Sequence, residues 1–173
     1  YPLMKGAADF CLAWLIDNPK QLGSDQAVDA VAAINSYPAP LIIIDMGTAT
    51  TVSVVDGSRN YLGGLIMTGM KTATDALIQR TAQLPKIDFE LPESIIGTNT
   101  IDCMKNGALY SNACALDWII ERIEEKLGEP CTAVATGGLA EAVVPLCRRE
   151  IILDKDLLIK GLAIIYRKNK KRS

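Results

Sequence analysis

The sequence predicts an α/β fold in which three antiparallel strands come first and helices and strands then alternate. Three short, largely apolar runs, the first two rich in β-branched residues, follow one another between residues 41 and 67, separated only by tight turns. Beyond them, segments with helical spacing alternate with short apolar runs, which is the pattern of a sheet covered by helices. With 173 residues, 49% of them hydrophobic, the chain can bury one sizeable core.

The first predicted element is a helix over residues 27–34. Ser24 or Asp25 is expected to cap it, because short polar side chains accept hydrogen bonds from the free N–H groups of a first helical turn. Pro38 and Pro40 are expected to end it, since proline cannot continue a helix.

Three strands are predicted next, over residues 41–44, 51–55 and 61–67. The first run is apolar throughout, which indicates a strand buried on both faces. The remaining elements are, in chain order, a helix over 72–83, a helix over 100–127 that is either continuous or broken near Gly107, a strand over 131–135, a helix over 139–146, a strand over 150–153 and a helix over 157–166.

Charge and hydropathy exclude several function classes. The chain has 18 basic and 20 acidic residues and a net charge of −2, so no general affinity for nucleic acid is expected. No apolar run approaches the roughly 20 residues of a membrane helix, so a cytoplasmic protein without membrane contact is expected. The basic run at 167–172 is interpreted as a solvated helix end.

The sequence contains five cysteines at irregular spacings and no histidine. No zinc site is therefore predicted, and the thiols are expected to be reduced and mostly buried. Without histidine, Ser-His-Asp and Cys-His catalysis are excluded, and a general base would be a carboxylate. These limits favour chemistry that depends on positioning, such as phosphoryl transfer. The cysteines are Cys11, Cys103, Cys114, Cys131 and Cys147.

Residues 45–51, with the sequence Asp-Met-Gly-Thr-Ala-Thr-Thr, carry the strongest chemical signal. At a bend between two strands they bring together one carboxylate, a glycine and three hydroxyls. Exposed N–H groups and threonine hydroxyls can hold phosphate oxygens, while Asp45 can hold a cation. The alternative is a plain Gly-Thr hairpin in which the aspartate satisfies its own turn.

A glycine pair, Gly137 and Gly138, follows the strand predicted over 131–135. Such a pair lets a nucleotide base or ribose approach the backbone closely, but it is equally typical of an ordinary turn from strand to helix. The apolar stretch around Trp118, residues 115–123, has helical spacing; core packing is expected there, with a dimer face as the alternative.

Six segments taken together resemble the ordered motifs of type III pantothenate kinases. They are residues 23–26, 45–51, 61–66 with Gly69, 96–100, 136–139 and 161–162, and the resemblance extends from about residue 15 to residue 169. It implies an actin, hexokinase and Hsp70-like fold with a ribonuclease H-like core. It also implies a homodimer that phosphorylates pantothenate, or a similar small molecule, from ATP with Mg²⁺ and a monovalent cation, K⁺ or NH₄⁺, in the first step of coenzyme A biosynthesis.

The resemblance also implies roles for individual residues. Asp25 matches the catalytic aspartate that accepts the proton of the attacking hydroxyl, and Asp45 matches a ligand of the monovalent cation. The remaining matches are Gly23, Ser24 and Gln26 in the substrate pocket, Thr100 against pantothenate across the dimer interface, and Thr48, Gly137 and Gly138 at the nucleotide.

The chain departs from the family pattern at several positions. Gln26 stands where the family has an arginine, Ile16 where it has a tyrosine, and Thr68 where it has a proline. The family's glycine-rich stretch is unrecognisable at 4–12, and its N-terminal phosphate-binding loop is not found. Residues 1–40 are therefore interpreted as the remnant of an N-terminal half and 41–173 as a ribonuclease H-like domain, and no kinase activity is expected from this chain alone.

Two other functions stay open because the substrate motif is altered. One is a non-catalytic binding or regulatory relative that keeps the fold. The other is a kinase for a different small hydroxy substrate, since Gln26 cannot supply the charged donors that an arginine offers to a carboxylate.

Overall fold

The computed structural model describes residues 23–170, and within this range the predicted α/β class is confirmed. The predictions that concern residues 1–22, among them Cys11, Ile16 and the stretch 4–12, lie outside the described residues, as does the end of the basic run at 171–172.

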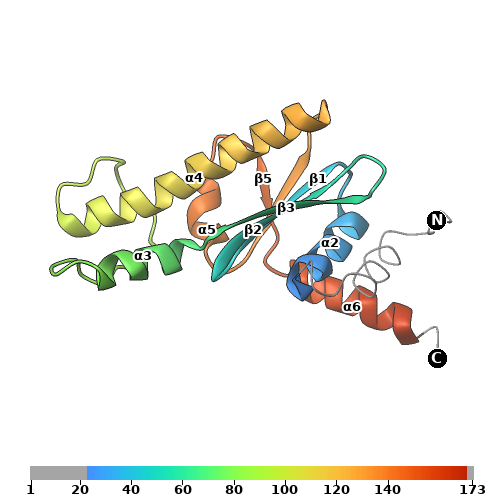
Figure 1. The fold of residues 1–173 in the computed structure, drawn as a ribbon, viewed down its shortest axis with the longest axis horizontal. Coiled ribbons are helices and arrows are strands. Elements are labelled where there is room, and N and C mark those ends of the chain that lie inside the picture. The colour runs from blue at the N-terminus through green and yellow to red at the C-terminus, as the bar shows by residue number, and fades with distance from the viewer. Residues whose placement is uncertain (1–22, 171–173) are drawn as a thin grey trace.

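A mixed five-stranded sheet with the strand order β3-β2-β1-β4-β5 forms the centre of the molecule (Figure 1). β1 pairs antiparallel with β2, and β2 with β3, while β1 to β4 and β4 to β5 are parallel. The strands are β1 (Leu41–Met46), β2 (Ala49–Val55), β3 (Tyr61–Thr68), β4 (Thr132–Thr136) and β5 (Ile151–Leu153).

Helices cover both faces of this sheet. They are α2 (Ser24–Ser36), α3 (Met70–Gln79), α4 (Thr100–Leu127), α5 (Ala140–Val143) with the 3₁₀ turn η1 (Val144–Leu146), and α6 (Leu157–Lys170). α4 is continuous through Gly107, so the alternative of a break there is wrong. Asn99 caps its start by accepting a hydrogen bond from Asp102 N–H at 3.0 Å, and Gly128 ends it in the left-handed conformation with φ 76°.

The start of α2 differs from the prediction. Gly23 is the N-cap, and neither Ser24 nor Asp25 caps the helix, so the expected capping by these two side chains is wrong. Both residues lie inside the first turn, where the Ser24 hydroxyl donates to Asp25 Oδ1 at 3.0 Å. A carboxylate in this turn interacts favourably with the helix dipole without capping it.

Three further helices have different bounds from those predicted. α6 ends at Lys170 and not at the predicted 166, because basic residues suit the C-terminal end of a helix. α3 begins two residues early, because Gly69 packs against the backbone of the β1–β2 turn and fixes the helix start there. It ends at Gln79, since residues 81–83 are exposed and have no apolar surface to cover. α5 is only one turn long, because Pro145 follows in a 3₁₀ turn.

The alternation of β1 side chains separates two hydrophobic cores. Ile42, Ile44 and Met46 face α4, whereas Leu41 and Ile43 face α2 and α6. Figure 1 shows α4 on one side of the sheet and α2 with α6 on the other. Asp45 therefore belongs to the face that α2 covers, which decides where the site forms.

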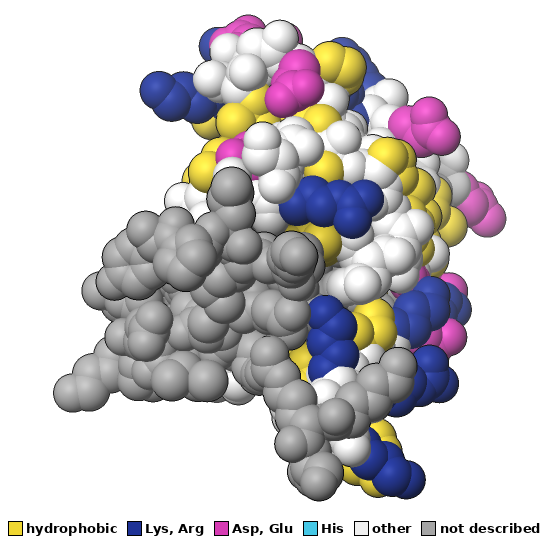
Figure 2. Space-filling view, turned by 90° about the vertical axis from the view of Figure 1, so that its right-hand side faces the viewer, with side chains coloured by type: hydrophobic (Ala, Val, Ile, Leu, Met, Phe, Trp, Pro, Cys, Tyr) yellow, Lys and Arg dark blue, Asp and Glu magenta, His cyan; other side chains and the backbone are white. Residues whose placement is uncertain are grey.

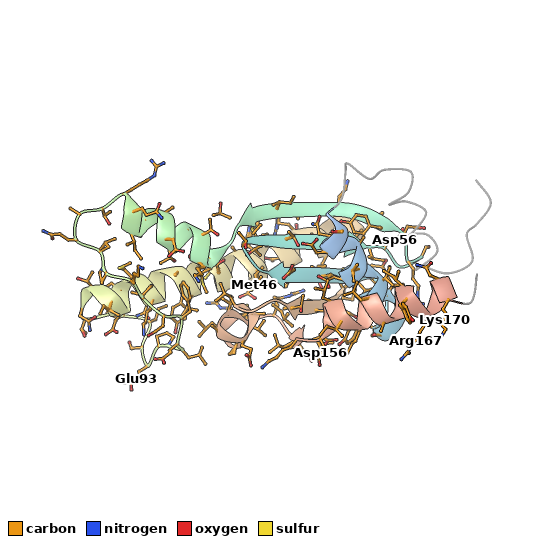
Figure 3. All side chains as sticks on the ribbon, turned by 90° about the horizontal axis from the view of Figure 1, so that it is seen from below. Met46, Asp56, Glu93, Asp156, Arg167 and Lys170 are labelled. Atoms are coloured by element: carbon orange, nitrogen blue, oxygen red, sulfur yellow. The ribbon has the colours of Figure 1, made fainter. Side chains whose placement is uncertain are left out.

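α3 and the first half of α4 extend beyond the sheet as an arm (Figure 1). The loop between them is tied to α4 by Asn106, whose amide donates to the carbonyls of Ser94 and Ile95 at 2.8 and 3.0 Å, and by a salt bridge from Lys105 to Asp88. In Figure 3 Glu93 marks this loop, while Arg167 and Lys170 lie at the opposite end of the molecule.

Two predictions about burial are wrong. Cys103 and Cys114 are exposed, and Cys131 and Cys147 are half-buried, so the described cysteines are not mostly buried. Trp118 is 60% exposed and does not pack in the core, although Leu116, Ile119 and Ile120 of the same predicted stretch do. All three exposed residues lie on α4, whose buried stripe runs instead through Leu109, Ala113, Leu116 and Ile120 at intervals of three and four residues.

Charges on the described surface are mixed. Figure 2 shows separate Lys and Arg side chains with acidic and apolar ones between them. Within residues 23–170, no helix has both the length and the apolar character that crossing a membrane requires.

Candidate functional site

The candidate site lies where the parallel strands β1 and β4 end. Asp45 pairs with Thr136 in the strand register, so the two residues that follow each strand, including Gly47 and Gly137, come to the same edge of the sheet. Ligands commonly bind at this edge in α/β folds. The structure therefore brings Asp45 and Gly137 together, although they are far apart in the sequence.

Gly137 forms a close-fitting wall against Asp45. Its φ is 93°, and a Cβ atom at this position would lie 2.6 Å from Asp45 Oδ1 and 2.7 Å from the backbone of Met46. No side chain can be added there without displacing the carboxylate or the strand. Gly138 has no such constraint, because a Cβ atom there would meet nothing within 4 Å.

The first turn of α2 adds Asp25 to the same region. Burial raises the pKa of Asp45, and the charge of Asp25 raises it further, so the two carboxylates are close enough to interact. Gly23 and Ser24 lie beside Asp25 at the exposed helix start. Gln26 turns back on this start, because its Oε1 accepts a hydrogen bond from Gly23 N–H at 3.3 Å.

A third carboxylate, Asp29, was missed by the sequence analysis. It follows Asp25 by one helical turn, is only 2% exposed, and its Oδ1 has no hydrogen-bond partner among residues 23–170. Burial, with the charges of Asp45, Asp25 and Asp154 in that order, raises its pKa to about 7. The available signal was a lone acidic residue four positions after Asp25, within a run otherwise apolar from 27 to 34.

Thr48 occupies the turn between β1 and β2. Its side chain is exposed, and its carbonyl accepts hydrogen bonds from Gly69 N–H at 3.2 Å and from the Thr72 hydroxyl at 2.8 Å. These two bonds join the turn to the start of α3. The exposed hydroxyl is therefore held on a fixed backbone next to the edge where Asp45 lies.

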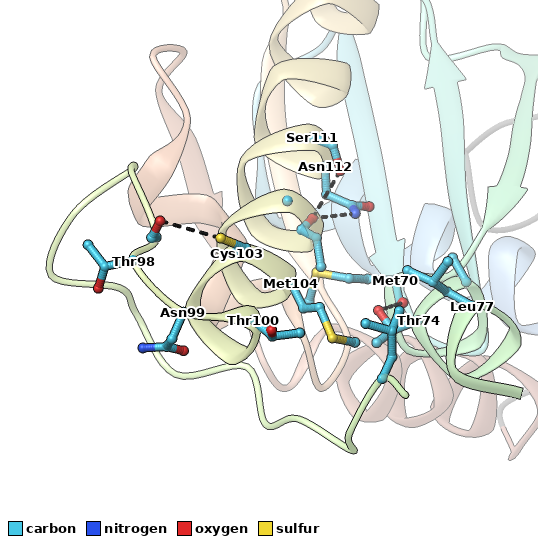
Figure 4. Close-up of a pocket in the computed structure, with 15 residues that line it drawn as sticks. Met70, Thr74, Leu77, Thr98, Asn99, Thr100, Cys103, Met104, Ser111 and Asn112 are labelled. Atoms are coloured by element: carbon cyan, nitrogen blue, oxygen red, sulfur yellow. Dashed lines mark hydrogen bonds between the residues drawn. The ribbon is translucent and has the colours of Figure 1, made fainter. Parts of the chain in front are cut away.

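Thr100 is not brought to Asp45. It lines a separate groove of about 760 Å³ between α3 and α4, on the arm, together with Thr74 and Met104 (Figure 4). Neither Asp25 nor Asp45 lines this groove. The other lining residues are Met70, Ala73, Leu77, Leu84, Gly97, Thr98, Asn99, Cys103, Gly107, Ala108, Ser111 and Asn112.

The side chains around Asp45 that could bind a cation are carboxylates, which suit some metal ions better than others. Among the described residues, no group of three or more cysteine, aspartate or glutamate side chains is placed to hold a metal ion. Asp45 and Asp29 nevertheless provide carboxylate oxygens in a buried, negatively charged place, which fits a hard monovalent cation better than a transition metal.

Comparison with known proteins gives consistent matches. Residues 2–122 match the family model for type III pantothenate kinase. A type III pantothenate kinase of Thermus thermophilus is 44% identical over 163 residues, which cover 92% of this chain and 64% of that protein. That of Exiguobacterium sibiricum is 41% identical over 155 residues, covering 90% and 61%. The chain thus spans less than two thirds of the length of these curated relatives.

A solved structure from Campylobacter jejuni, described as a Baf family transcriptional activator, has a similar fold. The two superpose with a TM-score of 0.56 over 83% of this chain and 65% of that one. Their sequences are 19% identical, so the likeness concerns the fold alone.

Proposed function

The chain belongs to the type III pantothenate kinase family, and from this premise we propose that the protein phosphorylates pantothenate with ATP, in the first step of coenzyme A biosynthesis. The observation that supports the proposal is the close packing of Asp45 against Gly137 at the edge where β1 and β4 end, with the charge of Asp25 raising the pKa of the Asp45 carboxyl. The described strands would then be a ribonuclease H-like domain, 41–173, of an actin-like kinase, and residues 1–40 the end of the preceding half.

The proposed reaction is an in-line transfer in which the side chains mainly position the reactants. The pantothenate hydroxyl oxygen forms a bond to the γ-phosphorus of ATP while the bond from that phosphorus to the β–γ bridging oxygen breaks. Asp25 accepts the hydroxyl proton, and ADP leaves. Asp25 suits this role because it is exposed at the helix start, where a substrate can reach it.

The nucleotide and its ions would be held around Asp45. Thr48 offers an exposed hydroxyl, and Gly138 leaves open space for a flat ligand. Gly137 lets the turn after β4 pack closely against Asp45. Mg²⁺ on the ATP phosphates and a monovalent cation, K⁺ or NH₄⁺, at Asp45 would neutralise negative charge when bound.

The decisive experiment is an ATP-dependent pantothenate phosphorylation assay on the full-length protein, with phosphopantothenate detected by mass spectrometry. Asp25→Asn should lower kcat by about 100-fold or more, because it removes the proton acceptor. Asp75→Asn, an exposed carboxylate on α3, is the matched control and should leave the rate unchanged. If the full-length protein forms no product with pantothenate, the proposal is wrong. The 173-residue chain should be assayed beside it, since its expected inactivity stays a prediction.

We also propose that the protein is a homodimer in which Thr100 contacts pantothenate bound to the other subunit. The arm supports this, since its groove lies away from Asp25 and its exposed side chains include several large apolar ones. Light scattering during gel filtration should give twice the subunit mass. The exposed apolar residues of the arm are Leu77, Leu91, Ile95, Ile96 and Ile101.

A kinase for another small hydroxy substrate is the second candidate, and Gln26 favours it. The Gln26 side-chain oxygen is bonded to its own helix start, and a neutral amide offers no charged fork to a carboxylate. We expect Gln26→Arg to lower KM for pantothenate by about tenfold while KM for its uncharged alcohol analogue, pantothenol, stays the same. An equal change for both compounds would mean that position 26 does not recognise the carboxylate.

A further inference from the structure

Asp29 has no role in the reaction proposed above, yet it is the most deeply buried carboxylate near the site. Its side chain is 2% exposed, and Oδ1 lacks a hydrogen-bond partner among the described residues. A buried carboxylate without a partner is costly, so native structures usually pair it with a cation or a hydrogen-bond donor. The described structure supplies neither to this oxygen.

Packing places Asp29 in the helix that covers the same sheet face as Asp45. α2 covers the face of β1 that carries Leu41 and Ile43, and strand alternation puts Asp45 on the same face. Asp29 also lies one turn along α2 from Asp25. The charge of Asp45 is the largest electrostatic influence on the Asp29 carboxyl, ahead of that of Asp25.

Asp154, a comparably buried carboxylate, shows what Asp29 lacks. Asp154 is 6% exposed and accepts hydrogen bonds from Lys160 Nζ at 2.6 and 2.8 Å and from the Tyr37 hydroxyl at 2.7 Å. Its negative charge is therefore neutralised inside the fold. Asp29 has no comparable cation among residues 23–170, so a positive charge from outside these residues would complete it.

We propose that Asp29 is a second carboxylate ligand of the monovalent cation at Asp45, so that the ion is held between α2 and β1. The choice of a monovalent ion rests on the function proposed above and on the donor set. Carboxylates suit hard cations, and no third acidic side chain is placed to form the cluster that a divalent ion commonly takes. The ion would join the helix that carries Asp25 to the strand that carries Asp45.

The test measures cation binding without ATP or pantothenate, so that it is independent of kinase activity. Thermal unfolding of the 173-residue chain is followed while KCl replaces choline chloride at constant ionic strength. The midpoint of the wild-type protein should rise with K⁺, because an ion that binds only the folded state stabilises it. In Asp29→Asn the K⁺ concentration for half of this rise should increase by about tenfold or more.

Asp75→Asn serves as the control and should titrate like the wild type. An unchanged K⁺ dependence in Asp29→Asn would overturn the proposal, as would a wild-type midpoint that does not respond to K⁺. In that second case Asp29 is a buried neutral acid, and Asp29→Asn should unfold at the same midpoint in both salts.

A second measurement does not require the variant to fold. Tl⁺ soaked into crystals of the wild-type protein should give an anomalous peak within ligand distance of both Asp29 and Asp45. A peak at Asp45 alone, or no peak, overturns the proposal. Since neither measurement uses the reaction, an inert protein can still bind the ion, and an active one can still fail this test.

Discussion

At Gly137 there is no room for even one side-chain carbon atom. A methyl group there would meet Asp45 Oδ1 and the Met46 backbone at under 3 Å, and the backbone φ of 93° is one that alanine adopts at a cost. We expect Gly137→Ala to lower the free energy of unfolding by about 2–4 kcal/mol and to weaken ATP binding by the full-length protein. Urea denaturation and calorimetry measure the two effects.

Gly138→Ala is the matched control for this substitution. The position has an ordinary φ and open space around it, so stability should change by less than about 1 kcal/mol. Equal losses in the two variants would show that the close contact with Asp45 is not what position 137 requires.

The buried carboxylate of Asp154 leads to a prediction about how the stability of the fold changes with pH. Burial opposes its ionisation, but hydrogen bonds from Lys160, Tyr37 and the Asp156 N–H outweigh burial and hold its pKa below the ordinary 3.8. Because the pKa of this carboxyl is lower in the folded than in the unfolded state, its ionised form stabilises the fold above about pH 4. This contribution to the free energy of unfolding is lost as the pH falls through the folded-state pKa. Asp154→Asn should therefore cost about 1–3 kcal/mol at pH 7 and progressively less below pH 4, measured by urea unfolding.

The exposed neighbour Asp156 supplies the comparison for that experiment. Asp156→Asn removes a carboxylate from the same turn, while the backbone N–H that bonds Asp154 remains. Its stability should follow the wild type across the pH range. A loss at Asp154 that is constant with pH would mean that the side chain acts through packing and not through its charge.

The sequence predicted only the part of the site whose residues are neighbours along the chain. Asp45 stood out because a carboxylate, a glycine and hydroxyls occur within seven residues. Asp29 did not, because a single acidic residue in a helix normally faces solvent, and only the packing of α2 on β1 shows it to be buried. The position of Thr100 on a separate groove depends on the arm, which no local pattern encodes.

At the scale of single elements, α4 contains one glycine in its interior and one at its C-terminal cap, so the effects of glycine at the two kinds of position can be compared within one helix. Gly107 lies in its interior, with open space where a Cβ atom would stand, while Gly128 ends it with φ 76°. Gly107→Ala should stabilise the chain by about 0.5–1 kcal/mol, because alanine loses less backbone entropy in a helix. Gly128→Ala should destabilise it by about 1–2 kcal/mol.

Chemical denaturation of both variants checks this pair. Two changes of the same sign would indicate that side-chain contacts, rather than backbone conformation, dominate at one of the positions. Since Gly107 lines the groove of the arm, the comparison is best made at protein concentrations where the oligomeric state is constant.

Element boundaries were predicted well where a residue imposes them and less well elsewhere. The start of α4 at Thr100 and its end at Gly128 were predicted correctly, since a polar cap and a glycine mark them. The start of α3 was predicted two residues late and its end four residues late. Its start depends on the contact between Gly69 and the β1–β2 turn, and its end on missing apolar contacts at 81–83. These are tertiary effects that the sequence pattern does not contain.

For the whole molecule, the prediction concerns which subunit supplies Thr100. Full-length Asp25→Asn and Thr100→Ala subunits are mixed, unfolded and refolded together. If Thr100 acts across the dimer, each mixed dimer has one intact site, so a random mixture recovers about a quarter of the wild-type activity. The readout is the rate at a pantothenate concentration well below KM.

Each variant refolded alone provides the baseline for that mixture. If Thr100 served the site of its own subunit, every site in a mixed dimer would carry one of the two substitutions, and the activity would stay at the baseline. If Thr100→Ala alone has full activity, Thr100 does not contact the substrate.

The position of β1 in the sheet has a consequence for how the chain is made. On one side β1 pairs with β2 across a short turn, but on the other Leu41 pairs with Thr132, far later in the chain. At about 5–20 residues per second, a ribosome needs several seconds to deliver β4 after β1. During this time the hairpin can form while an apolar strand presents one unpaired edge, so the nascent chain is most prone to aggregate before residue 132 emerges.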